Sequence, residues 1–454
     1  MLYLYIWLFP ILAGILAWRF KNKSLNSALV FAHSILHLFA GIAFVLPSSG
    51  LPEFLGIDGL SIWFFIISAI LYFAVGLYSL QLKGSLSNRQ SSIYAICMMA
   101  FVASMDGANL SRDLGLIWVF VETTTLASAL LISFEHHKQS LEAAWKYLFI
   151  CSIGIAMAFV GILLLVIAMP TASSLAIDTI LTLAETITPF WLKVSFVFML
   201  IGFGTKVGLA PLHFWLPDAH SEAPAAVSAL LSGALLNTAL LPLIRMQEVM
   251  NACHLGGLAS QLFITMGLIS MFVAAVFMLK IKNYKRMLAY SSIENMGIVM
   301  IAFALGEYAG KAGLIHVMGH SMIKAAFFLT AGNVYGIFGK KDYDQCSGLL
   351  AKNPISGWLW LISFMFIIGM PPSPLFLSEF YIAFALIASG NIIVLIAFFI
   401  LLAIIAYGLG CASLAITMGA GKARTKLPFS RYLPQIALLC CAVVLPLLLL
   451  YLVY

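Results

Sequence analysis

Apolar stretches long enough to cross a membrane recur along the whole chain. Most contain about 17–25 residues, the length that a helix needs to cross a hydrocarbon core about 30 Å thick. They predict fourteen transmembrane helices, at about residues 2–18, 27–47, 59–82, 91–109, 114–134, 143–168, 190–210, 224–245, 259–279, 288–305, 312–336, 356–388, 391–418 and 433–453. The stretch 356–388 contains Pro371, Pro372 and Pro374, which remove backbone donors and predict a broken helix.

The composition agrees with a membrane protein. Only 9% of the residues are charged and 63% are hydrophobic, against about 25% and 45–50% in soluble proteins. The first apolar stretch has no basic lead and no small-residue cleavage site, so we expect a retained helix rather than a signal peptide. The fold class is therefore an all-α polytopic membrane protein, and the pattern indicates no separate soluble domain.

Basic residues are distributed unevenly among the predicted connections. The even-numbered connections hold only Arg112, Lys193, Arg245 and Lys311, whereas the odd-numbered ones hold the other loop lysines and arginines. The rule that cytoplasmic loops are enriched in Lys and Arg predicts both termini outside. This bias accounts for the net charge of +7. The basic patch with interleaved aromatic residues that nucleic-acid binding would need is missing.

The cysteines do not indicate a metal or redox centre. The chain has 7 cysteines, mostly inside apolar stretches, with no C-x-x-C motif or Cys/His ligand spacing. We therefore expect no cofactor and no metal in this chain, and interpret the cysteines as small buried hydrophobic residues.

Several ionisable residues fall inside the predicted spans. A charged side chain at the centre of a bilayer costs at least about 2.5–3.5 kcal/mol, so such residues predict partners or a water-filled path. Glu122 lies in the fifth predicted span and Lys206 inside the seventh. We expect these two to form a pair whose protonation states depend on each other; a neutral Glu122 bonded to a nearby threonine is the alternative.

The residues after Lys206 are too polar and proline-rich for a regular span. The stretch 210–224 contains His213, Asp218, His220 and Glu222. Irregular backbone at membrane depth is tolerated where it is buried in protein or lines a cavity. The polar residues are expected either to line a route for proton uptake or to cap the next helix.

A second group lies in the later helices. His316, His320 and Lys324 are spaced by four residues and share one face of a helix, as in a proton wire. A metal at the histidines is disfavoured by the cation beside them. Glu379 follows the prolines of the broken span, and Glu294 lies in the tenth span.

Three further observations concern a histidine pair, a lysine near a helix end and the spacing of the ionisable residues. His33 and His37 share a four-residue spacing on the second span, with no charged companion in that stretch, and are interpreted as packing residues. Lys146 follows Glu142 by one turn, which fits either a surface ion pair or a role in proton uptake. The interval from Glu122 to Lys206 nearly equals that from Glu294 to Glu379, which would fit an inverted repeat.

Taken together, these stretches resemble the antiporter-like membrane subunits of respiratory complex I, membrane-bound hydrogenases and Mrp cation/proton antiporters. The motif sequences at Glu122–Ser128 and Tyr290–Gly297 are most similar to those of the component F type of hydrogenase-4. The motifs that carry the resemblance are Val121–Ser128, Ser140–Tyr147, Pro211–Pro224, Ala289–Gly297, His316–Lys324 and Ser378–Phe380.

The resemblance implies two inverted five-helix repeats, each with a broken helix. The implied division is 1–90 for the first helices, 91–245 and 259–418 for the repeats, and 433–454 for the last helix. It also implies a proton path through Glu122, Lys206, His316, His320, Lys324 and Glu379. Many members have Lys or His where this chain has Asn237, so the relay there would run through water or be interrupted. The long lateral helix of the most distal complex I subunit is expected to be missing.

The predicted function is proton translocation within a multisubunit, redox-driven complex of a prokaryotic inner or plasma membrane. The partners would be other antiporter-like subunits and a quinone or hydrogenase module, with no redox centre in this chain. A Mrp-type sodium/proton antiporter and a non-pumping scaffold or inorganic-carbon uptake subunit are the alternatives. An autonomous enzyme is disfavoured because no nucleophile–base or metal-ligand constellation is visible.

Overall fold

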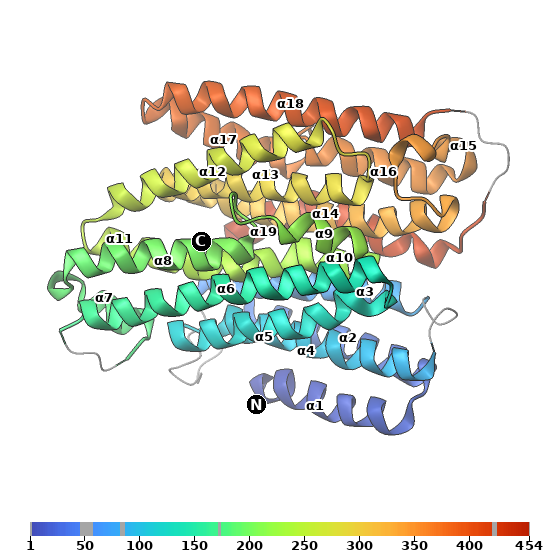
Figure 1. Ribbon diagram of the computed structural model, residues 1–454, viewed down its shortest axis with the longest axis horizontal. Coiled ribbons are helices and arrows are strands. Elements are labelled where there is room, and N and C mark those ends of the chain that lie inside the picture. The colour runs from blue at the N-terminus through green and yellow to red at the C-terminus, as the bar shows by residue number, and fades with distance from the viewer. Residues whose placement is uncertain (1, 46–57, 82–86, 171–173, 420–424, 454) are drawn as a thin grey trace. The chain divides into compact units, whose positions relative to one another are not determined.

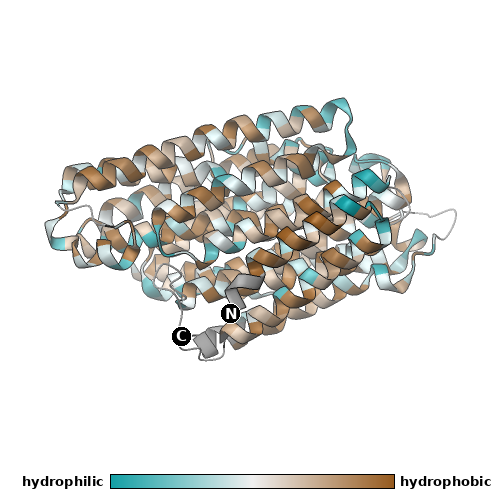
Figure 2. Cartoon of the chain, turned by 90° about the horizontal axis from the view of Figure 1, so that it is seen from below, coloured by the Kyte–Doolittle hydropathy of each residue, from teal (hydrophilic) through white to brown (hydrophobic). Residues whose placement is uncertain are grey.

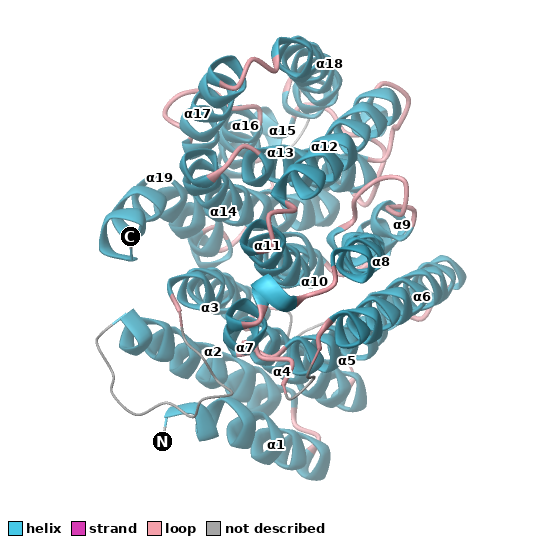
Figure 3. Cartoon of the chain, turned by 90° about the vertical axis from the view of Figure 1, so that its left-hand side faces the viewer, coloured by secondary structure: helices cyan, strands magenta, loops and turns pink. Residues whose placement is uncertain are grey.

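The computed structural model describes residues 2–45, 58–81, 87–170, 174–419 and 425–453, and helices account for most of them (Figure 1). Among these residues the only β-type pairings are two isolated bridges, so the described part contains no strand (Figure 3). The helices form two compact units. The first comprises residues 1–207 and 234–259, and the second comprises 208–233 and 260–452.

The first unit contains the N-terminal helices and one helix that follows the first interruption. Its helices are α1 (Leu2–Phe20), α2 (Lys23–Val45), α3 (Gly59–Ser79), α4 (Asn88–Leu110), α5 (Leu114–Ile132), α6 (Lys138–Ala168), α7 (Ile177–Thr182), α8 (Pro189–Val207) and α11 (Leu236–Ala252). The pairs α6–α8 and α4–α5 make close contacts along their lengths.

The second unit begins with the interrupted segment and continues to the C-terminal helix. Its helices are α9 (Trp215–Glu222), α10 (Ala225–Leu230), α12 (Gly256–Met278), α13 (Tyr284–Ala304), α14 (Glu307–Phe338), α15 (Leu349–Lys352), α16 (Pro354–Ile367), α17 (Pro374–Ala388), α18 (Ile392–Thr417) and α19 (Leu433–Val453). Here α14 contacts α10, α13, α16 and α17 and is the central helix.

The predicted spans agree closely with the observed helices. Within the described residues, eleven helices are long and apolar enough to cross a membrane, and four shorter apolar helices accompany them. Two of the short ones, α16 and α17, are the halves of the predicted broken span. Counting them as one gives the expected fourteen, and the chain is a multi-pass membrane protein. Parts of two predicted span ends, 46–47 and 82, lie outside the described residues.

Hydrophobic residues recur along the helices (Figure 2), and many large ones are exposed on the surface. Exposed examples include Phe39, Ile393 and Tyr407. In a soluble protein such a surface would be an interaction site; in a membrane span it is the surface that faces lipid or other apolar helices. The long helices of lowest mean hydropathy, α4, α13 and α14, are instead mostly or entirely buried. Polar residues of the second unit are therefore collected away from lipid.

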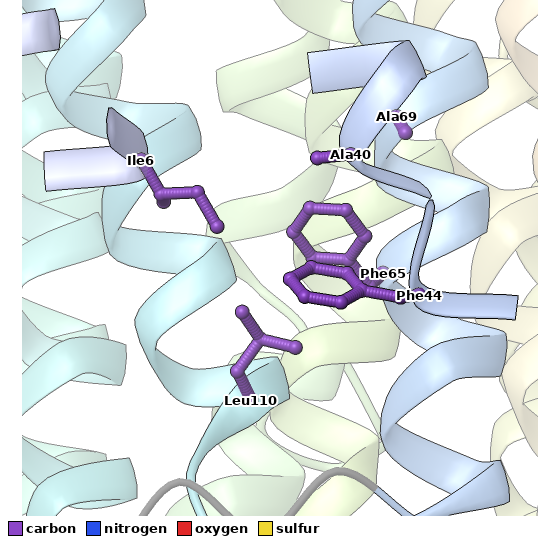
Figure 4. Close-up of a cluster of buried hydrophobic side chains, with 6 residues drawn as sticks. All are labelled: Ile6, Ala40, Phe44, Phe65, Ala69 and Leu110. Carbon is purple, nitrogen blue, oxygen red and sulfur yellow. The ribbon is translucent and has the colours of Figure 1, made fainter. Parts of the chain in front are cut away.

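An apolar cluster holds the first four helices together. It is formed by Ile6 of α1, Ala40 and Phe44 of α2, Phe65 and Ala69 of α3, and Leu110 of α4 (Figure 4). The rings of Phe44 and Phe65 pack edge to face, with centroids 5.1 Å apart, an arrangement that aromatic quadrupoles favour.

Charged residues connect several helix ends of the first unit. Asp58 caps α3 by accepting from the Ser61 amide, and its carboxylate also accepts from Arg112 and Arg245, at 2.8 and 2.9 Å. Arg112 bonds Asp178 as well. Burial of the Asp58 carboxyl by itself raises its pKa, but the Arg245 guanidinium and the Ser61 donors outweigh burial and hold this pKa below its usual value.

We predict that Asp58→Asn lowers the stability of the chain, because it leaves Arg245 buried without its counter-charge. The expected loss is about 3 kcal/mol, the lower end for breaking a buried pair, since the Asp58 side chain is 28% exposed. Thermal unfolding of the purified protein measures it. Asp178→Asn is the control: this side chain is 70% exposed, so its loss is expected below about 1 kcal/mol.

The pH dependence of the unfolding temperature provides a second test with the same variant. Because folding lowers the pKa of Asp58, its stabilisation is fully present above the usual value of 3.8 and disappears as pH falls through the lowered value. The gap in unfolding temperature between wild type and Asp58→Asn therefore closes in acid; a gap independent of pH would contradict the assignment.

Candidate functional site

Lys206 lies fully buried at the end of α8, one residue before that helix stops. Its Nζ donates to Thr125 Oγ1 of α5 at 2.7 Å and to the Tyr147 hydroxyl of α6 at 2.5 Å. The ammonium also lies 4.6 Å from the centroid of the Tyr147 ring, close enough for a cation–π interaction. Tyr147 is fixed in turn by Ser128, whose Oγ is 2.6 Å from the hydroxyl.

Glu122 lies next to this group through a hydroxyl bridge. Its Oε1 accepts from Ser152 at 2.7 Å, and its Oε2 accepts from Thr125 at 3.4 Å. Thr125 thus accepts a hydrogen bond from Lys206 and turns its own hydroxyl toward Glu122. The structure brings the two predicted residues together and places Thr125 between them. The alternative of a threonine bonded to Glu122 describes part of the same geometry.

The helix that carries Lys206 ends because of the residues that follow it. Gly208 has a φ of +82°, a conformation that favours glycine, and residues 208–214 are not helical. The short helices α9 and α10 follow. Asp218 pairs with Arg286 at 2.6 Å, and Glu222 with Lys341 at 2.8 Å.

These contacts bear on the two interpretations of the polar segment. Both carboxylates pair with basic residues near the ends of α13 and α14, and the N-cap residue of α10, Pro224, makes no side-chain cap bond. Lys285 adds a bond from its Nζ to the Ala223 carbonyl at 2.9 Å, at the junction between α9 and α10.

Three buried histidines of the second unit have ring nitrogens without a hydrogen-bond partner among the described residues: His213, His220 and His320. The His220 ring stacks on Phe328 of α14, with centroids 4.7 Å apart. Buried polar atoms in proteins are nearly always bonded to protein or water. These nitrogens therefore indicate positions for water molecules.

The stripe predicted on one helix face lies on α14, and its three members are fully buried. Lys324 Nζ donates to the Leu288 carbonyl at 2.6 Å and also to Ser291 Oγ of α13. His316 lies 3.0 Å from Asn295 Oδ1 and 2.8 Å from Ser378 Oγ. Asn295 also approaches Glu294, at 3.5 Å. Residues of α13, α14 and α17 thus form one hydrogen-bonded group.

Glu379 is placed beside the second interruption. The backbone turns at Gly369, with a φ of +70°, and Ser373 caps α17 by accepting from Leu375 at 3.2 Å. A Cβ at Gly369 would overlap the Glu379 carboxylate. Ser378, the residue before Glu379, provides the contact to His316.

The two remaining candidates differ in their surroundings. Lys146 is exposed and pairs with Glu142 at 2.8 Å, one turn away, which is the geometry of a surface ion pair. Asn237 is buried, directly after the π-helical turn Leu231–Leu235. Such turns often occur at functional sites.

Sequence reasoning missed the neutral residues of the site. Thr125, Tyr147, Ser291, Asn295 and Ser378 supply most of the hydrogen bonds described above. Searching the apolar spans for hydroxyl and amide residues beside each charge would have found them. The second span holds no charged companion for His37, but the fold places Asp106 of α4 3.3 Å from its Nε2, a contact that the pattern of a single span does not contain.

No group of three or more His, Cys, Asp or Glu side chains among the described residues is arranged to hold a metal ion. The expectation that the cysteines are buried holds for Cys97, Cys151 and Cys346, but Cys411 and Cys440 are exposed on their helices.

We predict that Gly369→Ala displaces Glu379 and destabilises the second interruption. Gly390→Ala is the matched control, because Gly390 has a φ of +72° but no atom within 4 Å of the added Cβ. Both variants carry backbone strain of about 1–2 kcal/mol, and Gly369→Ala should lose about 1–3 kcal/mol more through overlap. Thermal unfolding of both variants measures the difference, and equal losses would contradict the packing of Glu379 against Gly369.

Comparison with known proteins identifies the family to which this chain belongs. Residues 111–405 match the family described as NADH:quinone oxidoreductase/Mrp antiporter, transmembrane. The chain is 36% identical over 388 residues to a hydrogenase-4 component F homolog of Methylacidiphilum infernorum, covering 83% of this chain and 81% of that one. It is 29% identical to a Na(+)/H(+) antiporter subunit of Bacillus subtilis, covering 71% of this chain and 65% of the relative.

A solved structure shows the same fold. A chain of the membrane-bound sulfane sulfur reductase, an archaeal respiratory membrane complex, superposes with a TM-score of 0.89 at 21% identity, covering 99% of this chain and 96% of that one. The sequence match and the fold agree: the chain belongs to the NADH:quinone oxidoreductase/Mrp antiporter family of transmembrane proteins.

Proposed function

We propose that the chain is the proton-translocating, antiporter-like subunit of a redox-driven membrane complex of the hydrogenase-4 or complex I type. The observation that carries the proposal is the fully buried ammonium of Lys206, linked through Thr125 to Glu122. A cation is kept at this depth against a large desolvation cost, and its neighbours are all groups that can pass a proton.

The proposed mechanism begins with the bonds of Lys206. In the charged state the ammonium donates to Thr125 and Tyr147. A charge change in a neighbouring subunit that draws Glu122 away, or admits water, removes part of the stabilisation of the ammonium. Lys206 then releases its proton, and the return of Glu122 favours uptake of another. The proton moves on to the group around Lys324 and His316 and then to Glu379.

Other residues take part in uptake and release. We assign uptake to the segment with His213, Asp218, His220 and Glu222, because its carboxylates meet basic residues of connections that the charge bias places in the cytoplasm. Both termini would then lie outside the plasma membrane of a prokaryote. The electron transfer would occur in partner subunits, and this chain would bind no cofactor.

The replacement of Lys206 by Ala tests the proposal directly. Lys206→Ala is expected to abolish proton pumping while the complex still assembles, since the protonatable group is lost from the path. Proton uptake by membrane vesicles during turnover measures it. Lys193→Ala is the control on the same helix: Lys193 is exposed, so pumping should stay near wild type. Full pumping by an assembled Lys206→Ala complex would reject the mechanism.

The bridging hydroxyl provides a finer test. Thr125→Val keeps the shape of the side chain but removes the link between Lys206 and Glu122. A hydrogen bond to a charged group contributes about 1.5–3 kcal/mol, so we expect pumping to slow about tenfold or more. Thr123→Val is the control, because Thr123 is exposed and bonds the Val119 carbonyl of its own helix. Equal rates in the two variants would remove Thr125 from the mechanism.

A sodium/proton antiporter is the second candidate, and the likeness to the antiporter subunit of Bacillus subtilis favours it. Transport by vesicles that contain no hydrogenase or dehydrogenase subunits would support this function. Normal partner activity after joint neutralisation of Glu122, Lys206 and Lys324 would instead indicate a non-pumping scaffold.

A further inference from the structure

A second cluster of titratable side chains is buried in the N-terminal helices. It joins His33 and His37 of α2, Tyr72 of α3 and Asp106 of α4, all of them fully buried. His33 Nδ1 lies 3.0 Å from the Tyr72 hydroxyl, and His37 Nε2 lies 3.3 Å from Asp106 Oδ1. These positions precede the residues that match the family, 111–405, and the proton path proposed above does not use them.

The surroundings of the cluster are apolar. The Phe9 ring stacks on His33, with centroids 5.2 Å apart, and the Phe65 ring lies 4.6 Å from that of His37. Phe65 is part of the apolar cluster between the first four helices (Figure 4). An unpaired carboxylate in such a place costs several kcal/mol. One proton shared by His37 and Asp106 leaves the pair neutral overall, so the geometry favours the form of the pair that holds this proton.

Several polar atoms of the cluster indicate that water molecules bind there. Asp106 Oδ2, His33 Nε2 and both ring nitrogens of His37 have no hydrogen-bond partner among the described residues, so the 3.3 Å approach of His37 Nε2 to Asp106 Oδ1 is an ion-pair contact. Ser68 Oγ donates to Asp106 Oδ1 at 3.4 Å and leaves the second carboxylate oxygen unsatisfied. Buried atoms of this kind are normally bonded to water, and water beside an imidazole–carboxylate pair lets a proton arrive and leave.

Asp106 lies close to one end of its helix. Asp106 is four residues from the end of α4 at Leu110 and eighteen from its start at Asn88, which corresponds to about 6 Å and about 27 Å along the axis. Asn109 is buried between Asp106 and the nearer end, and its Oδ1 also has no partner among the described residues. The short route to water therefore runs past Asn109, toward the connection between α4 and α5.

We propose that His37 and Asp106, with His33 and Tyr72, form a reversible proton-binding site that exchanges with water at the α4–α5 end. Release breaks the N–H or O–H bond of the shared proton, passes that proton to water, and leaves neutral His37 beside ionised Asp106. Uptake reverses the step. No other reactant is needed, and the site does not depend on Lys206.

The titratable groups that face the pair come from the helices packed around α2. They are Tyr72 of α3, Asp106 of α4 and His33 of α2 itself, with Tyr94 of α4 acting on Tyr72 from farther away. The contact that α1 makes is the uncharged Phe9 ring. Any change in the protonation of the pair with pH is therefore attributed to these groups.

Infrared difference spectra of the assembled complex in acid and alkaline buffer test the site. We expect a carboxyl signal in wild type that disappears in Asp106→Asn and shifts in His37→Gln, together with proton uptake lower by about one proton per chain in Asp106→Asn. Ser68→Ala is the control, because it removes a hydrogen bond to the same carboxylate but no titratable group. Spectra and uptake unchanged by both Asp106→Asn and His37→Gln would overturn the proposal.

Two further variants separate this site from a structural role and from the pumping mechanism. Asn109→Leu should keep the signal but slow its response to a pH jump about tenfold; an unchanged rate would overturn the proposed route of exchange. Lys206→Ala should leave the signal intact even when pumping is lost. If Asp106→Asn does not assemble, His37→Gln alone decides. A wild-type spectrum of the His37→Gln complex would then mean that His37 and Asp106 share no proton, and it would overturn the proposal.

Discussion

The burial of charge inside the helices is the constraint on which the rest of this protein depends. Lys206 and Lys324 are both fully buried, and each is satisfied mainly by uncharged groups. Lys206 donates to two hydroxyls and Lys324 to a carbonyl and a hydroxyl. Neither ammonium has a directly bonded carboxylate among the described residues, so no direct ion pair holds the proton in place, which is the property that a proton carrier needs.

The interruptions in the helices follow from the same constraint. A regular helix uses its own backbone groups and offers nothing to a buried charge, whereas a helix end leaves amides and carbonyls free. The first interruption begins two residues after Lys206, and the second places Glu379 against Gly369. Proline-rich segments at these points stop the helices, and glycines with positive φ turn the chain.

Charges near helix ends have a different role from charges within the spans. Asp58, Arg112 and Arg245 form a network in which opposite charges meet directly, and so do Asp218 with Arg286 and Glu222 with Lys341. Direct pairs fix the positions of connections. Around the buried Lys206 and Lys324, by contrast, the bonds go to hydroxyl and carbonyl groups, whereas His37 of α2 faces Asp106 of α4 directly, which suggested a separate proton site.

The sequence alone determined the all-helical membrane fold, because a span must satisfy its backbone internally and therefore has a readable length and composition. It also located the interruptions, through proline and glycine, and the stripe from His316 to Lys324, through helical periodicity. Only the tertiary structure decided which side chains meet. Thr125 between Lys206 and Glu122, Ser378 against His316 and Asp106 beside His37 join helices far apart in sequence. Such contacts depend on the rotation and packing of neighbouring helices, and the hydrophobic pattern of a single helix does not contain that information.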